Sequence, residues 1–373
     1  MSTKPILSVC LPTYNRAQLL KSALLALIPQ INALSPEVEL LVSDNASTDE
    51  TQDVIAWAAT QMPLRHRRNE SNEGYYGNLY RLTGEMAQGE YVWVIGDDDL
   101  VRPDGLQRIV NALKAHPDTD FLFVNLTELP GSDLSKFDRP VTGADFPQLQ
   151  PTRCADLSEH AVGQWDELID PQIDNTFLGS VQVAVFRLNL WKAQLIPEKF
   201  IGKHVELGYY GMMLMGQALQ GKKAYYLGYP CIITFFGQQE WMGYLPTLIL
   251  FHVQNLLDSY RKSGVDSARI ERCREDLIIR SYKYLNHKLA HPEENREVKL
   301  WRFLWQTRQH FHRVRQMIQN IRESSETAIR LPLYYHITPH GLYDLAIVLY
   351  VSLPEPIKRL KRRFLPKSSG SNS

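Results

Sequence analysis

The sequence predicts an α/β fold, with a mostly parallel sheet flanked by helices and an α-helical C-terminal region. Two observations lead to this prediction. Apolar runs rich in β-branched residues alternate with segments of helical periodicity through the first half of the chain. From residue 241 onward the strand signals end and helical patterns dominate. Alternation of strand and helix favours parallel pairing, because each connecting helix returns the chain to the same end of the sheet.

The predicted elements follow one another in a regular order. The first strand leads into a helix that begins near Arg16 and carries an apolar stripe at helical spacing. The second strand leads into a helix that follows cap-forming residues at 45–48. The predicted strands are 6–11, 38–42, 64–68, 91–95, 121–124, 181–186, 223–227 and 231–236, and further predicted helices are 104–115, 210–220, 248–262, 267–289 and 297–321.

Polar clusters follow four strands of the predicted sheet, at residues 13–16, 43–45, 69–74 and 97–99. Ligands of open α/β sheets bind beyond the carboxyl ends of the strands. Four clusters at equivalent strand ends therefore indicate one site rather than four independent turns.

Asp97, Asp98 and Asp99 are the most informative of these residues. Three crowded carboxylates raise one another's pKa unless a cation compensates them, and their hard oxygen atoms suit Mg²⁺ or Mn²⁺. We therefore predict a divalent metal at this strand end. The structural alternative is a solvated turn or an N-cap of the predicted helix 104–115.

Charge is distributed unevenly along a chain that holds 41 basic and 41 acidic side chains. Residues 1–150 hold 12 basic and 20 acidic side chains, whereas residues 241–373 hold 22 basic and 12 acidic ones. This favours an acidic half that takes up a cation and a basic half suited to an anionic surface. No nucleic-acid-binding motif accompanies the basic half, so we expect no nucleic-acid partner.

The cysteines and the apolar segments indicate the compartment. The four cysteines lie far apart and form no CxxC pair, which favours neither a zinc site nor a disulfide framework and fits a reducing cytosol. The N-terminal residues lack an apolar signal segment, so we expect no secretion. The apolar stretch 342–353 is shorter than the roughly 20 residues that a membrane-spanning helix needs.

Two common phosphate-binding motifs, GxGxxG after the first strand and GxxxxGK[ST], do not occur in the sequence. This argues against dinucleotide-dependent oxidoreductases and P-loop nucleoside triphosphatases. A metal held by the aspartates, with Arg16 or backbone N–H groups nearby, would instead neutralise a diphosphate.

Four ordered segments together resemble the family 2 glycosyltransferases of GT-A fold. They are LSVCLPTYNR at 7–16, VSDNASTD at 42–49, NEG at 72–74 and GEYVWVIGDDD at 89–99. The resemblance is strong over about the first 125 residues and weak over 170–240. It implies transfer of a sugar, with inversion, from a nucleotide-diphosphate donor to an acceptor hydroxyl.

The same resemblance implies which residues bind the donor. Asp44 would hydrogen-bond the base, for which the alternative is an Asx-turn before the helix. Asp99, and next to it Asp97, would bind the Mn²⁺ or Mg²⁺ ion, while Asp98 or Asp97 would reach the ribose or a metal-bound water. The other implied nucleotide-sugar residues are Pro12, Thr13, Asn15, Arg16, Asn72, Gly74 and Asn78, the last with a packing role as its alternative.

Inversion also requires a general base that removes the proton of the acceptor hydroxyl. Members of the family usually place an acidic pair at the start of a helix on the acceptor side, and this chain lacks that pair. The matching neighbourhood offers Glu206 as the first candidate and His204 as the second, and Asp174 is a third. Ordinary charge near a helix N-terminus is the alternative for Glu206, and a structural histidine is the alternative for His204.

The segment 129–174 is rich in Pro, Gly, Asp and Ser and shows no period, so we predict a long irregular region that closes over the donor. Trp165 within this segment is interpreted as a core anchor, with stacking on a sugar as the alternative.

The predicted domain organisation has three parts. Residues 1–240 form a GT-A catalytic domain, with a nucleotide-binding half at 1–125 and an acceptor-side half at 126–240. Residues 241–366 form a helical region, and residues 367–373 form a disordered tail.

An apolar stretch at 342–353 followed by the basic cluster 358–365 suits an anionic membrane surface, and a docked helix with a basic end is the alternative. By family analogy, the protein would be cytoplasmic and peripheral on the inner face of the plasma membrane. Its acceptor would be a glycan or a lipid-linked precursor of surface polysaccharide or O-antigen.

Three other functions were compared with this one. A processive synthase would need channel segments and a Gln-xx-Arg-Trp stretch, which the sequence lacks. A nucleotidyltransferase would need a Gly-rich, basic loop near the N-terminus, and residues 11–15 are not such a loop. A catalytically inactive glycan-binding or scaffold protein of the same fold fits the missing acidic pair.

Overall fold

The computed structural model describes residues 4–131, 133, 137, 139, 152–195, 209–236 and 252–290, without the side chains of 210, 278, 279 and 281–290. The chain divides into two compact units. Met1–Gln239 and Asn255–Cys273 form the first unit, and Glu240–Gln254 and Arg274–Ser373 form the second. The sheet and the polar strand ends lie in the first unit.

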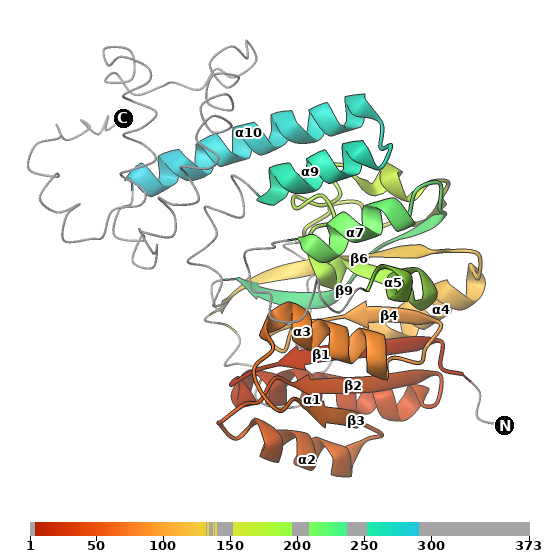
Figure 1. The fold of residues 1–373 in the computed structure, drawn as a ribbon, viewed down its shortest axis with the longest axis vertical. Coiled ribbons are helices and arrows are strands. Elements are labelled where there is room, and N and C mark those ends of the chain that lie inside the picture. The colour runs from red at the N-terminus through yellow and green to blue at the C-terminus, as the bar shows by residue number, and fades with distance from the viewer. Residues whose placement is uncertain are drawn as a thin grey trace, which may run out of the picture. The chain divides into compact units, whose positions relative to one another are not determined.

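Nine strands of the described residues form one mixed sheet (Figure 1), in the order β3-β2-β1-β4-β8-β6-β9-β5, with β7 paired to β9. β1 pairs in parallel with β2 and β4, and β2 with β3. β8 runs antiparallel to both β4 and β6, so β6 and its parallel neighbour β9 point the same way as β1. The strands are β1 (Leu7–Thr13), β2 (Val38–Asp44), β3 (Arg65–Arg68), β4 (Tyr91–Val94), β5 (Leu100–Val101), β6 (Phe121–Pro130), β7 (Glu159–Val162), β8 (Ala184–Arg187) and β9 (Ala224–Phe236).

Helices cover both faces of this sheet. In Figure 1, α3, α5 and α7 lie on the face toward the viewer, and α1 and α4 lie behind the sheet. A π-helical turn at Arg81–Met86 continues α3. The helices are α1 (Ala17–Leu34), α2 (Thr51–Gln61), α3 (Gly74–Tyr80), α4 (Gly105–Ala115), α5 (Leu188–Gln194), α7 (Tyr210–Ala218), α9 (Val253–Lys262) and α10 (Ser267–Ala290), with 3-10 turns at Trp165–Leu168 and Val181–Val183.

Helix α1 follows β1 directly and packs its apolar stripe on the sheet. Leu20, Leu24, Leu27 and Ile31 are fully buried, at the spacing that places them on one helix face. By length and composition α1 is the single described helix that could cross a membrane, yet half of its residues are buried within the fold. It therefore acts here as a core helix.

The α/β prediction is confirmed, and the differences have local causes. The two strands predicted at 223–227 and 231–236 are one strand, β9, despite Pro230. The pairing of β9 with β6 shifts between Leu227 and Ile232, so the N–H that Pro230 lacks is not needed there. In the segment expected to be irregular, β7 pairs with β9.

Trp165 is a core anchor, as interpreted from the sequence. Its side chain is 1% exposed, and its ring meets the edges or faces of Phe121 and Tyr260 at centroid distances of 6.3 and 5.4 Å. A ring buried in this way has no open face for a sugar, so the stacking alternative does not hold.

Candidate functional site

The polar strand ends lie together at one edge of the sheet. In the strand register, Thr13 of β1 lies opposite Asp44 of β2, and Asp44 lies opposite Arg68 of β3. Cys10 of β1 pairs with Val94, the last residue of β4, which lies three residues before Asp97. The sheet topology therefore brings these clusters together, as predicted, because parallel strands end at the same edge.

Asp97 is held by residues that follow β1. Its Oδ1 accepts a 2.5 Å hydrogen bond from Arg16 Nη1, and its Oδ2 accepts a 2.8 Å bond from the Thr13 hydroxyl. Arg16 Nη2 lies 3.3 Å from Asp98 Oδ2, so one guanidinium bridges two carboxylates. Thr13, Arg16, Asp97 and Asp98 thus form one cluster, as the sequence resemblance implied.

Asp99 points back to the loop that carries it. Its Oδ2 accepts a 3.0 Å bond from the N–H of Gly96, and its own N–H donates to the Gly96 carbonyl at 3.2 Å. A Cβ atom on Gly96 would lie 2.5 Å from Asp98 Oδ1 and 2.9 Å from Asp99 Oδ2, so any other residue here would displace these carboxylates. All three aspartates are at most 8% exposed. A solvated turn is therefore excluded, and α4 begins later, after Asp104.

Burial makes negative charge costly in this cluster. It raises the pKa of Asp97 to about 6, against the opposing positive charge of Arg16 and with a further rise from Asp98. Burial, followed by the charge of Asp98, also raises the pKa of Asp99 well above its ordinary value, while the Gly96 N–H opposes this rise. One arginine therefore does not compensate the three carboxylates.

Asp44 is fully buried and uses both carboxylate oxygens within the fold. Its Oδ1 accepts a 2.9 Å bond from the backbone N–H of Ser47, and its Oδ2 accepts a 2.5 Å bond from Gln52 Nε2. Arg68 Nε lies 3.6 Å from the same Oδ2. The bond to Ser47 corresponds to the turn-forming alternative, and base binding by Asp44 stays a prediction.

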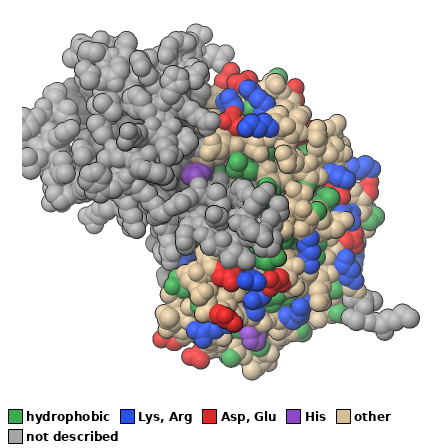
Figure 2. All heavy atoms as spheres, in the orientation of Figure 1, with side chains coloured by type: hydrophobic (Ala, Val, Ile, Leu, Met, Phe, Trp, Pro, Cys, Tyr) green, Lys and Arg blue, Asp and Glu red, His purple; other side chains and the backbone are tan. Residues whose placement is uncertain are grey.

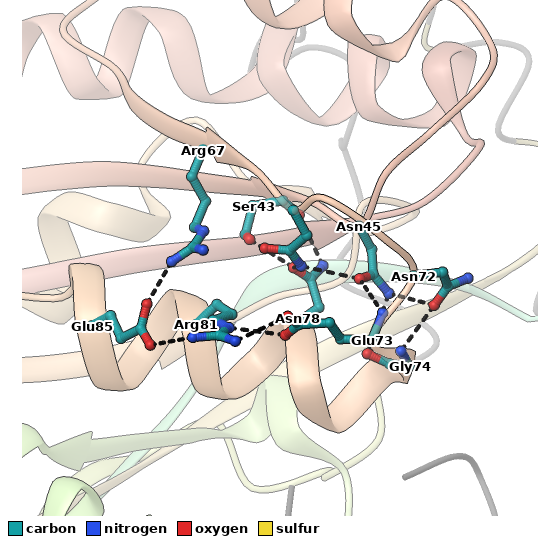
Figure 3. Close-up of polar contacts among 10 residues, drawn as sticks. Ser43, Asn45, Arg67, Asn72, Glu73, Gly74, Asn78, Arg81 and Glu85 are labelled. Atoms are coloured by element: carbon teal, nitrogen blue, oxygen red, sulfur yellow. Dashed lines mark hydrogen bonds and ion pairs between the residues drawn. The ribbon is translucent and has the colours of Figure 1, made fainter. Parts of the chain in front are cut away.

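An asparagine cluster joins the end of β2 to the start of α3 (Figure 3). Asn45 Nδ2 donates to Asn72 Oδ1 at 2.8 Å and to the Gly74 carbonyl at 3.2 Å, and Asn45 Oδ1 accepts from the Glu73 N–H at 3.0 Å. Asn72 Oδ1 also accepts from the Gly74 N–H at 2.9 Å. Gly74 has φ +75°, a conformation that glycine adopts without strain. This cluster fixes the segment that the resemblance assigns to the donor.

Asn78 is buried beneath this segment. Its Oδ1 accepts bonds from the Ser43 hydroxyl at 2.6 Å and from Asn69 Nδ2 at 3.1 Å, and its Nδ2 donates to the Ser43 carbonyl at 2.9 Å. The side chain is therefore committed to internal contacts. These contacts favour the packing alternative for Asn78.

A chain of ion pairs follows on the outer side of α3. Arg81 pairs with Glu73 at 2.9 Å and with Glu85 at 2.6 Å, and Glu85 pairs with Arg67 of β3 at 2.5 Å (Figure 3). Figure 2 accordingly shows acidic and basic side chains next to one another over α3. The hydrogen bonds that Arg81 donates to Glu73 and Glu85 raise the pKa of Arg81, so it stays charged. Arg81 stabilises the α3 segment from outside.

The residues before Arg16 are fixed by the loop after β2. Asn15 has φ +51°, its N–H donates to Ser47 Oγ at 2.8 Å, and its Oδ1 accepts from the Thr48 N–H at 2.7 Å. Pro12 lies opposite Ser43 in the sheet. Asn15 is exposed at the strand edge, where a ligand can reach it.

Two exposed tyrosines flank the aspartates, and sequence reasoning did not select them. Tyr14, which follows β1, is 36% exposed, and Tyr75, which begins α3, is 41% exposed. Burial of its hydroxyl end, followed by the charges of Asp99 and Asp98, raises the pKa of Tyr75 even though much of the residue is open. Exposed rings at this edge can pack against a planar base or a sugar ring. Their exposure marks these two tyrosines as candidate ligand contacts, and exposure cannot be predicted from residue type alone.

Asp174 has the environment of a structural residue. It is fully buried, its Oδ1 accepts from Arg153 at 2.9 Å, and its Oδ2 accepts from the Thr176 hydroxyl at 2.5 Å and the Leu178 N–H at 2.7 Å. A carboxylate with these partners is poorly suited to take a proton from an acceptor. We therefore do not include Asp174 in the proposed mechanism.

Arg153 also holds Glu128, a site-side carboxylate that the sequence did not indicate. Its Nη2 lies 2.6 Å from Glu128 Oε1 near the carboxyl end of β6. The side chain of Glu128 is 35% exposed, in contrast to the buried Asp174. Arg153 lies 25 residues from Glu128 and outside any motif, so this pair could not be predicted from the sequence.

Glu206 and His204, the first two candidates for the general base, lie outside the described residues. The predicted helix that follows them is present as α7. Their roles therefore stay predictions.

The carboxylates at the strand edge fit a divalent cation that binds together with a phosphate-bearing ligand. Within the described ranges, no three Asp, Glu, His or Cys side chains converge as a complete metal site. Mg²⁺ usually needs only one or two protein carboxylates, because waters and substrate phosphates supply its other ligands. Asp97 and Asp99 offer buried, hard oxygen atoms whose charge is not fully compensated.

Residues 8–142 match the family model described as Glycosyl transferase family 2. The match covers 135 of the 373 residues, so the similarity to this family concerns that segment of the chain. The segment contains all four strand-end clusters, from Thr13 to Asp99.

Two sequence relatives carry transferase names. Abequosyltransferase RfbV of Salmonella typhimurium is 34% identical over 147 residues, which are 39% of this chain and 39% of that protein. The poly(ribitol-phosphate) beta-N-acetylglucosaminyltransferase TarS of Staphylococcus aureus is 27% identical over 124 residues, which are 33% of this chain and 21% of that protein. The chain thus matches less than half of the length of these two relatives.

The fold extends the similarity beyond the matched segment. The crystal structure of TarS 1-349 from S. aureus has a TM-score of 0.54 with this chain, at 16% sequence identity, and the alignment covers 97% of this chain and 93% of that one. At this identity the likeness concerns the fold alone, and it confirms the predicted GT-A type of α/β architecture.

Proposed function

We propose that this protein is an inverting, metal-dependent glycosyltransferase that moves a sugar from a nucleotide-diphosphate donor to an acceptor hydroxyl. The observation that carries the proposal is the buried cluster Asp97–Asp99, which lies with Thr13 and Arg16 at the carboxyl edge of the sheet inside a family 2 segment. The named activities of RfbV and TarS support sugar transfer as the reaction class.

In this proposal the strand edge holds the donor. Asp44 would accept a hydrogen bond from the base after exchanging one of its internal partners, Gln52 or Ser47. The loop 12–16 and the segment 72–74 would line the nucleotide and the sugar, because their backbones are fixed on either side of that carboxylate. The exposed rings of Tyr14 and Tyr75 would exclude water from the bound donor.

Asp99 and Asp97 would hold a divalent cation, Mn²⁺ or Mg²⁺. When bound, the cation would stabilise the negative charge that grows on the leaving nucleoside diphosphate. Gly96 keeps Asp98 and Asp99 close to the loop backbone, and Thr13 fixes the direction of Asp97. These contacts would preorganise the carboxylates before the donor arrives.

The general base would be Glu206, with His204 as the second candidate. It would take the proton of the acceptor hydroxyl as that oxygen attacks the anomeric carbon from the side opposite the diphosphate, which gives inversion. This assignment rests on the sequence neighbourhood 202–209.

The acceptor in the proposal is a glycan or a lipid-linked precursor of a surface polysaccharide such as O-antigen. The basic segment 358–365 would hold the protein at the inner face of the plasma membrane, where such an acceptor lies. Both statements rest on the sequence and on the family, because the segment lies outside the described residues.

Donor binding tests the proposal. Isothermal titration calorimetry with a panel of UDP-, GDP-, CDP- and dTDP-sugars, each with and without Mn²⁺, should find at least one sugar nucleotide that binds only with the metal. Asp99→Ala should abolish this binding. Asp118→Ala is the matched control, since Asp118 is exposed and, among the residues that the structure describes, forms its ion pair with the exposed Lys223.

Three results would redirect the proposal. Absence of binding by every sugar nucleotide in the panel would overturn it. Metal-dependent binding without release of nucleoside diphosphate in the presence of cell-envelope glycans would favour an inactive glycan-binding or scaffold protein. Release of pyrophosphate from a nucleoside triphosphate and a sugar phosphate would identify a nucleotidyltransferase.

A further inference from the structure

The guanidinium of Arg16 contacts an oxygen atom of Asp97, one of the two residues proposed to hold the cation. Its Nη1 lies 2.5 Å from Asp97 Oδ1, and its Nη2 lies 3.3 Å from Asp98 Oδ2. The other oxygen of Asp97 accepts the Thr13 hydroxyl at 2.8 Å. Each carboxylate oxygen has a second lone pair, so the hydrogen bonds alone do not exclude a divalent ion, but repulsion between the ion and the adjacent positive charge favours displacement of Arg16.

The backbone of Arg16 is fixed, so only its side chain can change partner. The Arg16 carbonyl accepts the Leu20 N–H at 2.9 Å in the first turn of α1. The next N–H, from Ala17, donates to Asp49 Oδ2 at 3.0 Å, and this carboxylate comes from the loop after β2. The Arg16 side chain is 18% exposed, whereas those of Asp97 and Asp98 are 4% and 10% exposed. The guanidinium thus lies at the open side of the cluster.

We propose that Arg16 competes with the divalent cation for Asp97, and that binding of both cation and donor moves its guanidinium onto the donor's diphosphate. This inference rests on the proposed function. Arginine suits the exchange, because its planar fork of N–H donors matches phosphate oxygens as well as it matches carboxylates. The charge balance also suits it, because three carboxylates can accept a divalent ion once one arginine has left.

The exchange couples two binding events. A cation that arrives alone must release Arg16 into water, which weakens its binding. A cation that arrives with a nucleoside diphosphate gives Arg16 a new anion, so each ligand strengthens the binding of the other to the same extent. The protein should therefore bind the cation weakly on its own and much more tightly with the diphosphate.

Titration of the full-length, metal-free protein with Mn²⁺ alone tests the competition. Free Mn²⁺ is measured by electron paramagnetic resonance for the wild type, Arg16→Gln and Arg16→Lys. Arg16→Gln should bind Mn²⁺ roughly tenfold or more tightly than the wild type, because a positive charge next to the ion is removed. Arg16→Lys should lie between the two, since an ammonium keeps the charge but cannot bridge both carboxylates.

The second half of the experiment repeats the titration with saturating UDP and with saturating GDP. For the wild type, one of these nucleotides should increase the affinity for Mn²⁺ by more than tenfold, and in Arg16→Gln this increase should be several times smaller. Arg65→Gln is the matched control, because Arg65 lies on the edge strand β3, pairs with Glu39 and is 46% exposed. Its Mn²⁺ affinity should equal that of the wild type.

The order of the Mn²⁺ affinities decides the inference. Equal or weaker Mn²⁺ binding by Arg16→Gln, with circular dichroism and thermal unfolding like those of the wild type, overturns it. Absence of Mn²⁺ binding by all variants up to 10 mM, roughly the weakest affinity that calls for a site, overturns it as well. The proposed function is judged separately, by donor binding and its loss in Asp99→Ala, so either one can fail alone.

Discussion

The buried negative charge of Asp97 destabilises the folded protein, and the hydrogen bonds from its neighbours do not fully offset this effect. Arg16 and Thr13 both donate to it, yet burial still raises its pKa to about 6. Ligand sites are often built from such groups, since the charge that destabilises the free protein attracts the ligand. Stability and binding therefore place opposite demands on this residue.

Replacement of Asp97 by asparagine should raise stability at neutral pH. In the unfolded chain this carboxyl has a pKa of about 3.9, so the folded protein holds the proton more tightly and loses stability as the pH rises from about 4 through about 6. Asparagine resembles the protonated form. Thermal unfolding in buffer with chelator should show a higher Tm for Asp97→Asn than for the wild type at pH 7.5 and little difference at pH 4. A lower Tm at pH 7.5 would mean that the Arg16 pair outweighs burial.

Glu206→Gln should separate donor binding from transfer. If Glu206 is the general base, the variant should bind the donor with unchanged affinity while its rate of transfer falls by ~10²–10⁴-fold. His204→Asn is the companion variant, and a comparable loss there with a normal Glu206→Gln would exchange the two assignments. For both variants, calorimetry measures the donor affinity and release of the nucleoside diphosphate measures the rate of transfer.

At the scale of single residues, the sequence predicted which residues lie at the strand edge better than it predicted which residues they contact. The aspartate triplet and Arg16 lie in short ordered motifs, so the cluster that they form was expected. The hydrogen-bond partners of Asp44 were not expected, because the bond from Gln52 depends on how α2 packs against β2. Glu128 and Arg153 were missed for the same reason, since they meet only once β6 and the chain after residue 151 are in place.

The loops at the strand edge owe their shape to contacts between elements. Asp49, after β2, accepts the first N–H of α1, and Asn45 holds the start of α3. Arg153 does the same in the second half of the sheet, where it connects Asp174, before β8, with Glu128 of β6. These contacts join elements that are far apart in sequence, so they make the edge rigid only in the complete fold.

Asp174→Asn should destabilise the protein without acting on catalysis directly. It leaves the guanidinium of Arg153, which is 9% exposed, without one of its two charged partners. Breaking a buried ion pair on one side costs about 3–5 kcal/mol, and denaturant unfolding followed by circular dichroism should show a loss in that range. At a temperature where the variant is folded, its donor affinity should match that of the wild type. A fully stable variant without transfer activity would instead make Asp174 the base.

Elements were predicted well where pattern alone decides them. β1, β2, β4 and β6 are buried apolar runs, and α4, α7 and α10 begin within one residue of the expected starts. The short strands β5 and β7 were not predicted, because two and four residues carry too little periodicity and their pairing depends on β9. The sequence prediction divided β9 into two strands at Pro230. In the structure the pairing with β6 shifts there, so the N–H that proline lacks is not needed.

On the scale of the whole molecule, the two ends of the chain differ in charge. Residues 1–150 have an excess of eight acidic side chains, and residues 241–373 have an excess of ten basic ones. The acidic excess belongs to the half with the carboxylate site. The basic excess is in the part that we propose to lie against an anionic surface.

Deletion of all residues after Gly341 should release the protein from membranes. Vesicles that contain phosphatidylglycerol should retain the full-length chain on sedimentation at low salt, and the shortened chain should stay in the supernatant, because the apolar and basic segments 342–365 are gone. Vesicles of phosphatidylcholine alone are the control and should retain neither. Equal retention of both chains would refute the membrane proposal.

The thirteen-residue strand β9 has a further consequence. It pairs with β6 on one side and, at Ile232 and Ile233, with β5 on the other, directly after the aspartates. One continuous strand, β9, thus links the loop after the aspartates to the second half of the sheet, and residue 125, the predicted boundary between the two halves of the domain, does not separate them in the fold. A fragment that stops there would leave Leu100 and Val101 without their partner strand, so the aspartate loop can be studied only in a chain that reaches Phe236.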